Sequence, residues 1–229
     1  MLSIAACVYR IRARGLFLIF FLGLAGCTLP HPGAAPLVHD FGPGALHSAP
    51  SKRLANLPTL ELAPVQASAA LGSTAVLYRL AYADAQQPRP YALARWSMPP
   101  AQLIGQRLRE QLGQQRAVLI PGDIVQTRPA RATSAPAPAA TVPPVLSLRV
   151  QLEEFSQLFE TTDKSSALVR LSATVMQHSA AGDTLLAQRS FITRQPAPTA
   201  DAHGGVQALT AATDQAIAEI DAWLAQMPH

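Results

Sequence analysis

Residues 145–155 read VLSLRVQLEEF, and apolar side chains recur at every second position from Leu146 to Leu152. A period of two predicts a β-strand with one buried face, because successive side chains of a strand point to opposite sides of the sheet. Residues 168–175 repeat the pattern, and residues 184–193 follow after the turn sequence AAGD at 180–183. Consecutive strands joined by short turns form an antiparallel meander. We therefore expect a sheet in the second half of the chain.

Two amphipathic helices are expected beside this sheet. Residues 205–226 carry apolar side chains at helical spacing, so this closing helix has to bury one face against the sheet. A second helix is predicted after Pro99-Pro100, because proline is favoured in the first turn of a helix. Ile104, Leu108 and Leu112 share one face of that helix.

The first half of the chain contains shorter strand signals, at residues 37–41, 59–63, 76–82, 91–96 and 117–120. Residues 76–82 and 91–96 predict a β-hairpin with a long loop that turns at residues 88–90. Residues 128–144, RPARATSAPAPAATVPP, have Val142 as their one large apolar side chain. We expect a mobile Pro/Ala loop there, inserted into a single domain, because a segment with so few large apolar side chains cannot bury enough surface to offset its ordering entropy.

The N-terminal 26 residues indicate a bacterial lipoprotein signal peptide. Three arginines precede the apolar residues 16–22 and the sequence LAGC at 24–27. The apolar stretch is about nine residues, against roughly 20 for a helix that spans a bilayer, and this order of segments marks a secretory signal. A pair of small residues before a cysteine resembles the lipobox, at which Cys27 becomes the lipidated N-terminus. An ordinary signal peptide with a chance cysteine, or an uncleaved anchor, is the alternative.

Residues 27–36 are predicted to form a lipidated tether, and residues 37–229 the folded body. The sequence TLPHPGAAP at 28–36 has no periodicity, and nine extended residues reach at most about 30 Å. We therefore expect the body to lie close to a membrane. Once Cys7 is removed with the signal and Cys27 is lipidated, no thiol remains for a disulfide or a nucleophile.

The charge of the mature chain argues against nucleic acid as a partner. Three of the 18 basic residues precede Cys27, so 15 remain against 14 acidic residues, a net charge of +1. The basic pI therefore belongs largely to the signal segment, and no aromatic residue is interleaved with a basic cluster.

The polar side chains indicate no catalytic, metal or cofactor site. Glu153 and Glu154 are adjacent on a predicted strand, so they point to opposite faces and are interpreted as a solvated edge. Asp201 is interpreted as the N-cap of the last helix, in preference to a phosphate cradle at Gly204-Gly205. Four of the six histidines are candidate ligands, but they are isolated or lie in irregular segments: His31, His39, His47 and His178. We predict a protein that is not an enzyme and holds no cofactor.

Trp96 and Trp223 have two interpretations. A tryptophan at a strand end, or on the apolar face of a helix, is usually part of the core. The alternative is contact with a partner or with lipid, since indole combines a large apolar area with one donor.

In their order, these motifs resemble the auxiliary lipoprotein component of ABC-type transport systems. The matching segments are VLYR at 76–79, YALARW at 91–96, PP at 99–100, LI at 103–104 through Leu108 and Leu112, LRVQLEEF at 148–155, VRL at 169–171, and VQAL at 206–209 through Ala216, Ile220 and Trp223. The resemblance covers most of the mature chain, and the Pro/Ala loop at 128–144 departs from it.

The resemblance implies a single α/β (α+β) domain, with a mixed or mainly antiparallel sheet and two helices on one face. It also implies a non-catalytic subunit that joins an MCE-domain (mammalian cell entry) protein in lipid transport between the inner and outer membranes. The position after Cys27 is Thr28 and not the aspartate typical of inner-membrane retention, which favours the outer membrane, on its periplasmic face. The sequence leaves open whether the chain forms a homo-oligomer. The alternatives are a structural or adaptor lipoprotein of the envelope without a transport role, and a lipid-modified hydrolase.

Overall fold

The computed structural model describes residues 34–44, 57–121, 145–179 and 182–227. Residues 36–229 form one compact unit, distinct from residues 1–35. Its elements, in chain order, are β1 (Leu37–His39), β2 (Leu60–Leu62), β3 (Gln66–Ala67), the 3-10 helix η1 (Ala69–Leu71), β4 (Ala75–Leu80), β5 (Asp84–Trp96), α2 (Pro100–Gly113), β6 (Val118–Leu119), β7 (Val145–Phe159), β8 (Ser165–Ser179), β9 (Gly182–Pro196) and α3 (Ala202–Ala225).

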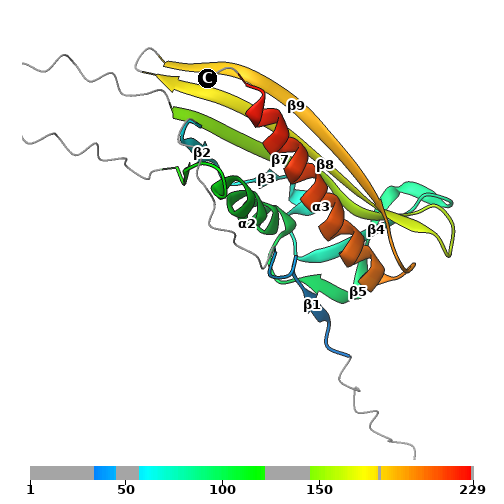
Figure 1. The fold of residues 1–229 in the computed structure, drawn as a ribbon. Coiled ribbons are helices and arrows are strands. Elements are labelled where there is room, and N and C mark those ends of the chain that lie inside the picture. The colour runs from blue at the N-terminus through cyan, green and yellow to red at the C-terminus, as the bar shows by residue number, and fades with distance from the viewer. Residues whose placement is uncertain (1–33, 45–56, 122–144, 180–181, 228–229) are drawn as a thin grey trace, which may run out of the picture. The chain divides into compact units, whose positions relative to one another are not determined.

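The strand β7 is the centre of the sheet that the described residues form. One edge of β7 pairs antiparallel with β8, which pairs antiparallel with β9. The other edge of β7 pairs in parallel with three short strands in succession, β2, β3 and β4. β4 continues antiparallel to β5, and β5 pairs in parallel with β1. β1 and β9 therefore lie at opposite ends of a single path of strands (Figure 1).

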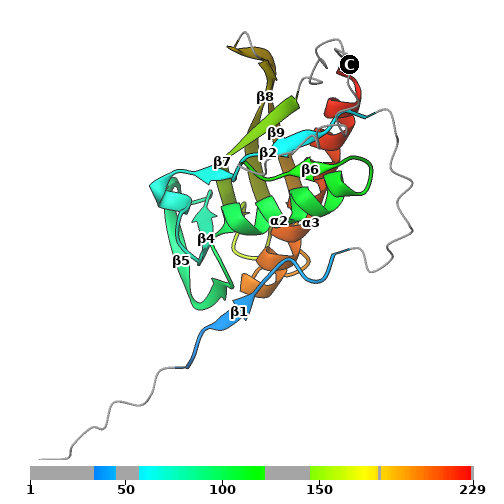
Figure 2. The same ribbon diagram turned by 90° about the vertical axis from the view of Figure 1, so that its left-hand side faces the viewer.

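Both helices cover the same face of the sheet. α3 lies lengthwise over the long strands, with α2 beside it (Figure 1). Figure 2 shows α2 next to the small parallel pair of β2 and β6. The core lies between the helices and the sheet. Leu148, Leu152 and Leu171, which belong to the predicted strand alternation, are fully buried there together with Leu108 and Leu209 of the helices.

The structure confirms the mixed sheet, the two helices on one face and the single domain. α2 covers Pro100–Gly113 as the proline pair predicts. The three strands of the meander are longer than their apolar alternation indicated, because polar residues at their ends still pair with neighbouring strands.

The predicted hairpin loop is wrong. Residues 88–90 do not turn, because β5 runs unbroken from Asp84 to Trp96 and the connection after β4 is only residues 81–83. The proposed mobile loop at 128–144 and the signal at 1–26 lie outside the described residues. Of the described helices, none is long and apolar enough to cross a membrane.

Candidate functional site

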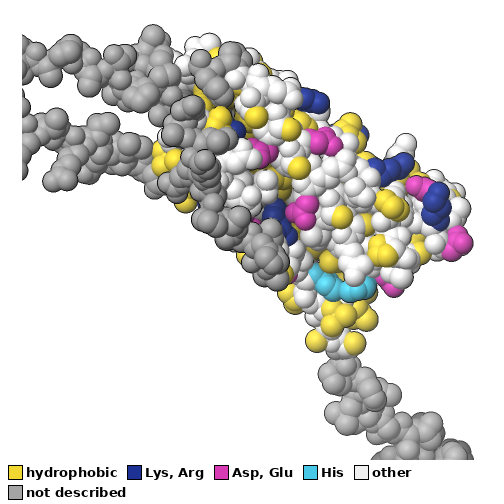
Figure 3. Space-filling view, viewed as in Figure 1, with side chains coloured by type: hydrophobic (Ala, Val, Ile, Leu, Met, Phe, Trp, Pro, Cys, Tyr) yellow, Lys and Arg dark blue, Asp and Glu magenta, His cyan; other side chains and the backbone are white. Residues whose placement is uncertain are grey.

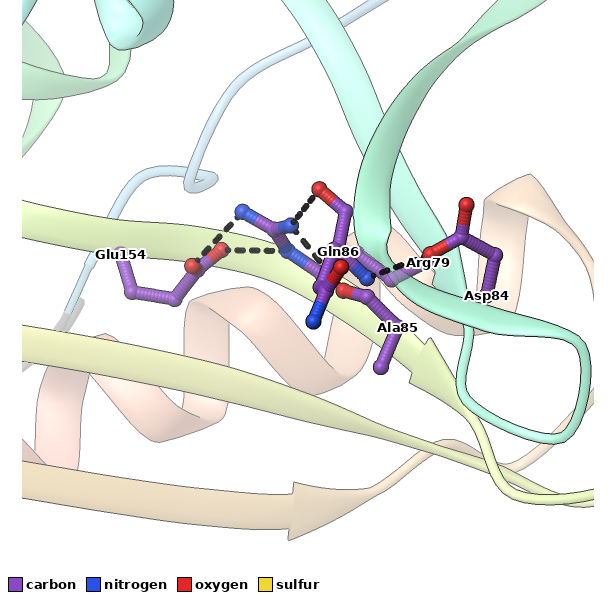
Figure 4. Close-up of polar contacts among 5 residues, drawn as sticks. All are labelled: Arg79, Asp84, Ala85, Gln86 and Glu154. Carbon is purple, nitrogen blue, oxygen red and sulfur yellow. Dashed lines mark hydrogen bonds and ion pairs between the residues drawn. The ribbon is translucent and has the colours of Figure 1, made fainter.

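Arg79 on β4 and Glu154 on β7 form a two-bond ion pair on the face of the sheet opposite the helices (Figure 4). Nη2 lies 2.9 Å from Oε2, and Nε lies 3.3 Å from Oε1. The remaining nitrogen, Nη1, donates to the carbonyl oxygens of Ala85 and Gln86, both at 3.2 Å. Figure 4 shows the guanidinium between the carboxylate and the start of β5. Each of its three nitrogens therefore binds an acceptor of the protein itself.

This ion pair corrects the interpretation of Glu154 as part of a solvated edge. β7 is a central strand, and the side chains of Glu154 and Arg79 are only 17% and 20% exposed. The register of β7 against β8 shifts between Leu152 and Glu154, which marks a bulge at Glu153. Because a bulge adds one residue to the strand, it changes which side chains face the core. Glu153 itself is exposed.

A groove of about 720 Å³ lies between the segment after β1 and the two helices. Arg107 of α2 lines the groove and is 11% exposed, with Nε 3.1 Å from Asp214 of α3 and Nη1 3.7 Å from Glu110. Its Nη2 donates to the carbonyl oxygen of Phe41. Figure 3 shows basic and acidic atoms in contact in the middle of this face.

The charges of this groove do not favour an anionic ligand. Two carboxylates face the one guanidinium, and burial raises the pKa of the Asp214 carboxyl, an effect that Arg107 opposes and Glu110 reinforces. The arrangement instead ties the segment after β1 to both helices. It thereby sets where the N-terminal part of the chain enters the folded body.

Asp201 is the N-cap of α3, as the sequence indicates. Its Oδ1 accepts a hydrogen bond from the backbone N–H of Gly204 at 2.8 Å and from the hydroxyl of Thr199 at 2.8 Å. The bond from Gly204 is the main reason that the pKa of Asp201 is lowered. A Cβ on Gly204 would lie 2.2 Å from the carbonyl oxygen of Thr199, so the glycine permits a close backbone approach. This N-terminus is occupied by its own aspartate.

A buried polar chain lies under the start of α3. The hydroxyl of Tyr91 donates to Oε1 of Gln157 at 2.7 Å, and Nε2 of Gln157 donates to the hydroxyl of Ser165 at 2.7 Å. Gln157 is fully buried, and a Cβ on Gly205 would lie 2.1 Å from its Oε1. Burial raises the pKa of the Tyr91 hydroxyl, with further contributions from Tyr78 and Asp201.

A buried ion pair joins the turn after α2 to α3. Nη2 of Arg116 lies 3.8 Å from Oδ1 of Asp221, and the two side chains are 1% and 9% exposed. Gln115 donates to Oδ2 of Asp221 at 3.4 Å. Burial lowers the pKa of Arg116, and the nearby Asp221 carboxylate opposes that shift. Sequence patterns did not indicate this pair, since its members are 105 residues apart.

The two tryptophans have different environments. Trp96 is 2% exposed and packs against Phe41 and Phe155, with ring centroids 5.5 Å away in both cases. The structure therefore assigns Trp96 to the core and corrects the alternative of a partner or lipid contact, because no indole surface is available. Trp223 is half-buried and packs edge-on against Phe191 at 5.6 Å, so part of its ring reaches the surface.

The remaining candidates lie partly outside and partly inside the described residues. Cys27, His31 and His47 lie outside the described residues. Within the described ranges, no group of three His, Cys, Asp or Glu side chains could hold a metal ion. His178, expected to be isolated, contacts Asp183 across the β8–β9 turn, with Nδ1 2.5 Å from Oδ1.

A family model described as the ABC-type transport auxiliary lipoprotein component matches residues 43–221. The chain belongs to this family. As an ABC-type transport auxiliary lipoprotein, it is a membrane-associated protein of the periplasmic envelope that works with an ABC transport system. The description of the family is that of an auxiliary component of transport. The resemblance noted from the ordered motifs is thus confirmed.

Solved structures share the fold of this auxiliary lipoprotein. A crystal structure of a Xanthomonas campestris protein assigned to the family DUF330 aligns with a TM-score of 0.56 at 16% identity, covering 85% of this chain and 88% of that chain. A second crystal structure, of a protein described as uncharacterized, aligns with a TM-score of 0.50 at 15% identity, covering 72% and 91%. Such low identities concern the fold alone. No curated protein matches the chain.

Proposed function

We propose that this auxiliary lipoprotein is the outer-membrane-anchored, non-catalytic subunit of an MCE-type ABC system that moves lipid between the inner and outer membranes. The observation that carries the proposal is the family match over residues 43–221, which starts 16 residues after Cys27 in the sequence LAGC. The match supports an auxiliary role in transport. The MCE partner comes from the ordered resemblance of the motifs.

The proposed anchor is a set of acyl chains, palmitate among them, on Cys27. One acyl chain gives only marginal membrane binding, so stable anchoring takes more than one chain. Thr28 favours the outer membrane, because an aspartate at that position would resemble the inner-membrane retention signal. The periplasmic body would then begin about nine residues from the lipid.

The polar groups of the body support a role in contact and not in catalysis. Arg79, Arg107 and Asp201 each have their donors or acceptors bound by other groups of the chain. Catalysis needs a positioned acid, base or nucleophile within hydrogen-bond reach of a reacting group. In the described ranges, the hydrogen bonds place no serine hydroxyl beside a histidine. For the MCE-domain partner we propose the half-buried Trp223 as a contact residue.

The experiment is affinity isolation of the tagged chain from separated inner and outer membranes, followed by protein identification and lipid analysis. We expect the chain in the outer-membrane fraction, together with an MCE-domain protein and its permease and ATPase. Trp223→Ala should reduce recovery of the MCE protein, and Tyr82→Ala, which also truncates an exposed aromatic residue, serves as the matched control.

A gene deletion tests the role in lipid traffic. We expect the deletion strain to show altered outer-membrane lipid and greater detergent sensitivity. Unchanged outer-membrane lipid composition and detergent sensitivity, with no MCE protein in the isolate, would contradict the proposal. Recovery of other envelope proteins or polymers instead would favour the adaptor lipoprotein.

A further inference from the structure

Exposed apolar side chains gather at the edge of the sheet where the described chain begins. Leu37 and Val38 on β1 are 68% and 67% exposed, and Leu93 on the neighbouring β5 is 51% exposed. Figure 3 shows hydrophobic atoms at the lower end of the body, where Figure 1 places β1. Large apolar side chains left in water next to one another mark an interaction site.

The strand register places these residues around one free edge. Val38 is opposite Arg95 in the parallel pairing of β1 with β5, and Leu93 lies two residues before Arg95. Because side chains two apart on a strand share a face, Val38, Leu93 and Arg95 lie on one side of the sheet. Leu37 points to the other side. β1 is the last strand at this end, so the apolar surface wraps around the edge.

Arg95 places a positive charge at this edge. Nη1 of Arg95 donates to the carbonyl oxygens of Tyr91 and Ala94, and within the described ranges no carboxylate lies within ion-pair distance of its guanidinium. The nearby acidic residue on the same segment, Asp40, accepts a hydrogen bond from the backbone of Gly42. Apolar side chains beside an arginine suit the interface of a phospholipid bilayer, where the apolar groups enter the lipid and the guanidinium meets the headgroup phosphates.

The position of the edge in the chain indicates that the membrane is its binding partner. β1 begins at Leu37, directly after the tether at residues 27–36. A tether of nine residues reaches at most about 30 Å, so a lipidated Cys27 would hold this edge near the bilayer at high effective concentration. β9, which also carries exposed apolar side chains, lies at the opposite end of the strand path.

We propose that the β1 edge, formed by Leu37, Val38 and Leu93, rests on the phospholipid surface of the membrane that holds the acyl anchor. The contact orients the body so that β1 faces the lipid and β9 faces away. This inference rests on the proposed lipidation of Cys27, and it adds which face of the body meets the membrane.

The test uses the full lipoprotein with one introduced cysteine, V38C or L93C. Acylation blocks Cys27 and signal removal takes away Cys7, so the introduced thiol is available for a fluorescent label. The labelled protein is reconstituted into vesicles of phosphatidylethanolamine and phosphatidylglycerol that contain brominated acyl chains. The matched control is I192C on β9, where the native side chain is 58% exposed.

We expect the brominated lipid to quench the label at positions 38 and 93 and to leave the label at 192 unquenched. The double substitution L37D/V38D should abolish quenching at 93, and because both side chains are exposed it should leave the urea unfolding midpoint unchanged. An acylated protein with equal quenching at 38 and 192, or with none at 38 and 93, would overturn the proposed orientation. A protein whose mass shows no acyl chains would instead overturn the anchoring itself.

Discussion

Arg79 of β4 and Glu154 of β7 face each other through two nitrogen–oxygen contacts of 2.9 and 3.3 Å, although 75 residues separate them in the chain. The pair lies where β4 joins β7 in parallel, and Arg79 also binds two carbonyl oxygens of β5. One side chain therefore connects three strands. Bidentate pairs of this kind are stronger than ordinary surface ion pairs.

We expect Glu154→Ala to destabilise the fold. The substitution leaves a guanidinium that is only one-fifth exposed without its carboxylate, and losing a hydrogen-bonded charged partner costs about 1–3 kcal/mol. The free energy of unfolding in urea measures the effect. The exposed neighbour Glu153→Gln is the matched control and should change stability by less than about 0.5 kcal/mol. Equal effects of the two substitutions would contradict the importance of the ion pair.

Tyr91→Phe should lower the stability of the protein at neutral pH. It should also reduce the loss of stability that the native chain shows at alkaline pH. Removal of the hydroxyl leaves the buried Oε1 of Gln157 without that donor, at a cost of about 1–3 kcal/mol. In the native chain, burial raises the pKa of Tyr91 above the ordinary tyrosine value of about 10. The unfolded chain therefore ionises first as the pH rises, and the native state loses stability above about pH 10.

For Tyr91, the free energy of unfolding in urea is measured at neutral pH and again above about pH 10, the ordinary tyrosine pKa. The phenylalanine variant should show a smaller drop between the two conditions than the native chain. Tyr82→Phe, which alters a half-exposed ring, serves as the control. An identical alkaline drop in the Tyr91 variant and the native chain would refute the assignment.

Gly204→Ala should destabilise the protein although alanine is the better helix former. The new Cβ would lie 2.2 Å from the backbone oxygen of Thr199, which cannot move away as a flexible side chain could. Overpacking of this kind costs about 1–3 kcal/mol, against a propensity gain of up to about 1 kcal/mol. Thermal unfolding checks this prediction.

Gly113→Ala is the matched substitution on α2, because a Cβ there would meet nothing within 4 Å. It should be neutral or stabilising by up to about 1 kcal/mol. If both alanine variants were equally stable, the close approach at Gly204 would not be the reason for the glycine.

The buried pair of Arg116 and Asp221 should behave non-additively. Asp221→Leu leaves a guanidinium that is 1% exposed without its counter-charge, and breaking a buried pair costs about 3–5 kcal/mol. Arg116→Met should be similarly costly, whereas the double variant R116M/D221L should be more stable than either single variant. A double-mutant cycle from urea unfolding measures this coupling, and simple additivity would argue against a direct interaction.

Cys27→Ser should release the protein from the membrane without unfolding the body. The acyl chains are the proposed attachment, and Cys27 precedes every element of the fold. Membrane fractionation after a salt wash, with circular dichroism of the released protein, tests both parts. Persistence of the variant in the washed membrane fraction would count against the lipid anchor.

Local patterns were sufficient to predict most of the elements. The period of two in residues 145–155 and 168–175 identified β7 and β8, and Pro99-Pro100 identified the start of α2. Asp201 was recognised as a cap because an aspartate before a helix accepts from the first N–H groups. These predictions succeed because each depends on neighbours a few residues away.

The predictions that failed concern features that depend on contacts between residues far apart in the chain. Residues 88–90 contain two prolines that locally favour a turn, but the pairing with β4 keeps them within β5. Glu154 was expected to be solvated. Its partner Arg79 lies on a different strand, and sequence spacing could not indicate that the two side chains meet. The bulge at Glu153, which moves Phe155 into the core, likewise appears only when β7 is aligned with β8.

By itself, the sequence determined the element types, the apolar faces, the expected lipobox and the family resemblance, because these depend on local order along the chain. Only the tertiary structure decided that three short strands line one edge of β7 in parallel, that Trp96 is buried while Trp223 reaches the surface, and that Leu37, Val38 and Leu93 share one exposed edge. These facts follow from strand pairing and helix packing between residues far apart in the chain.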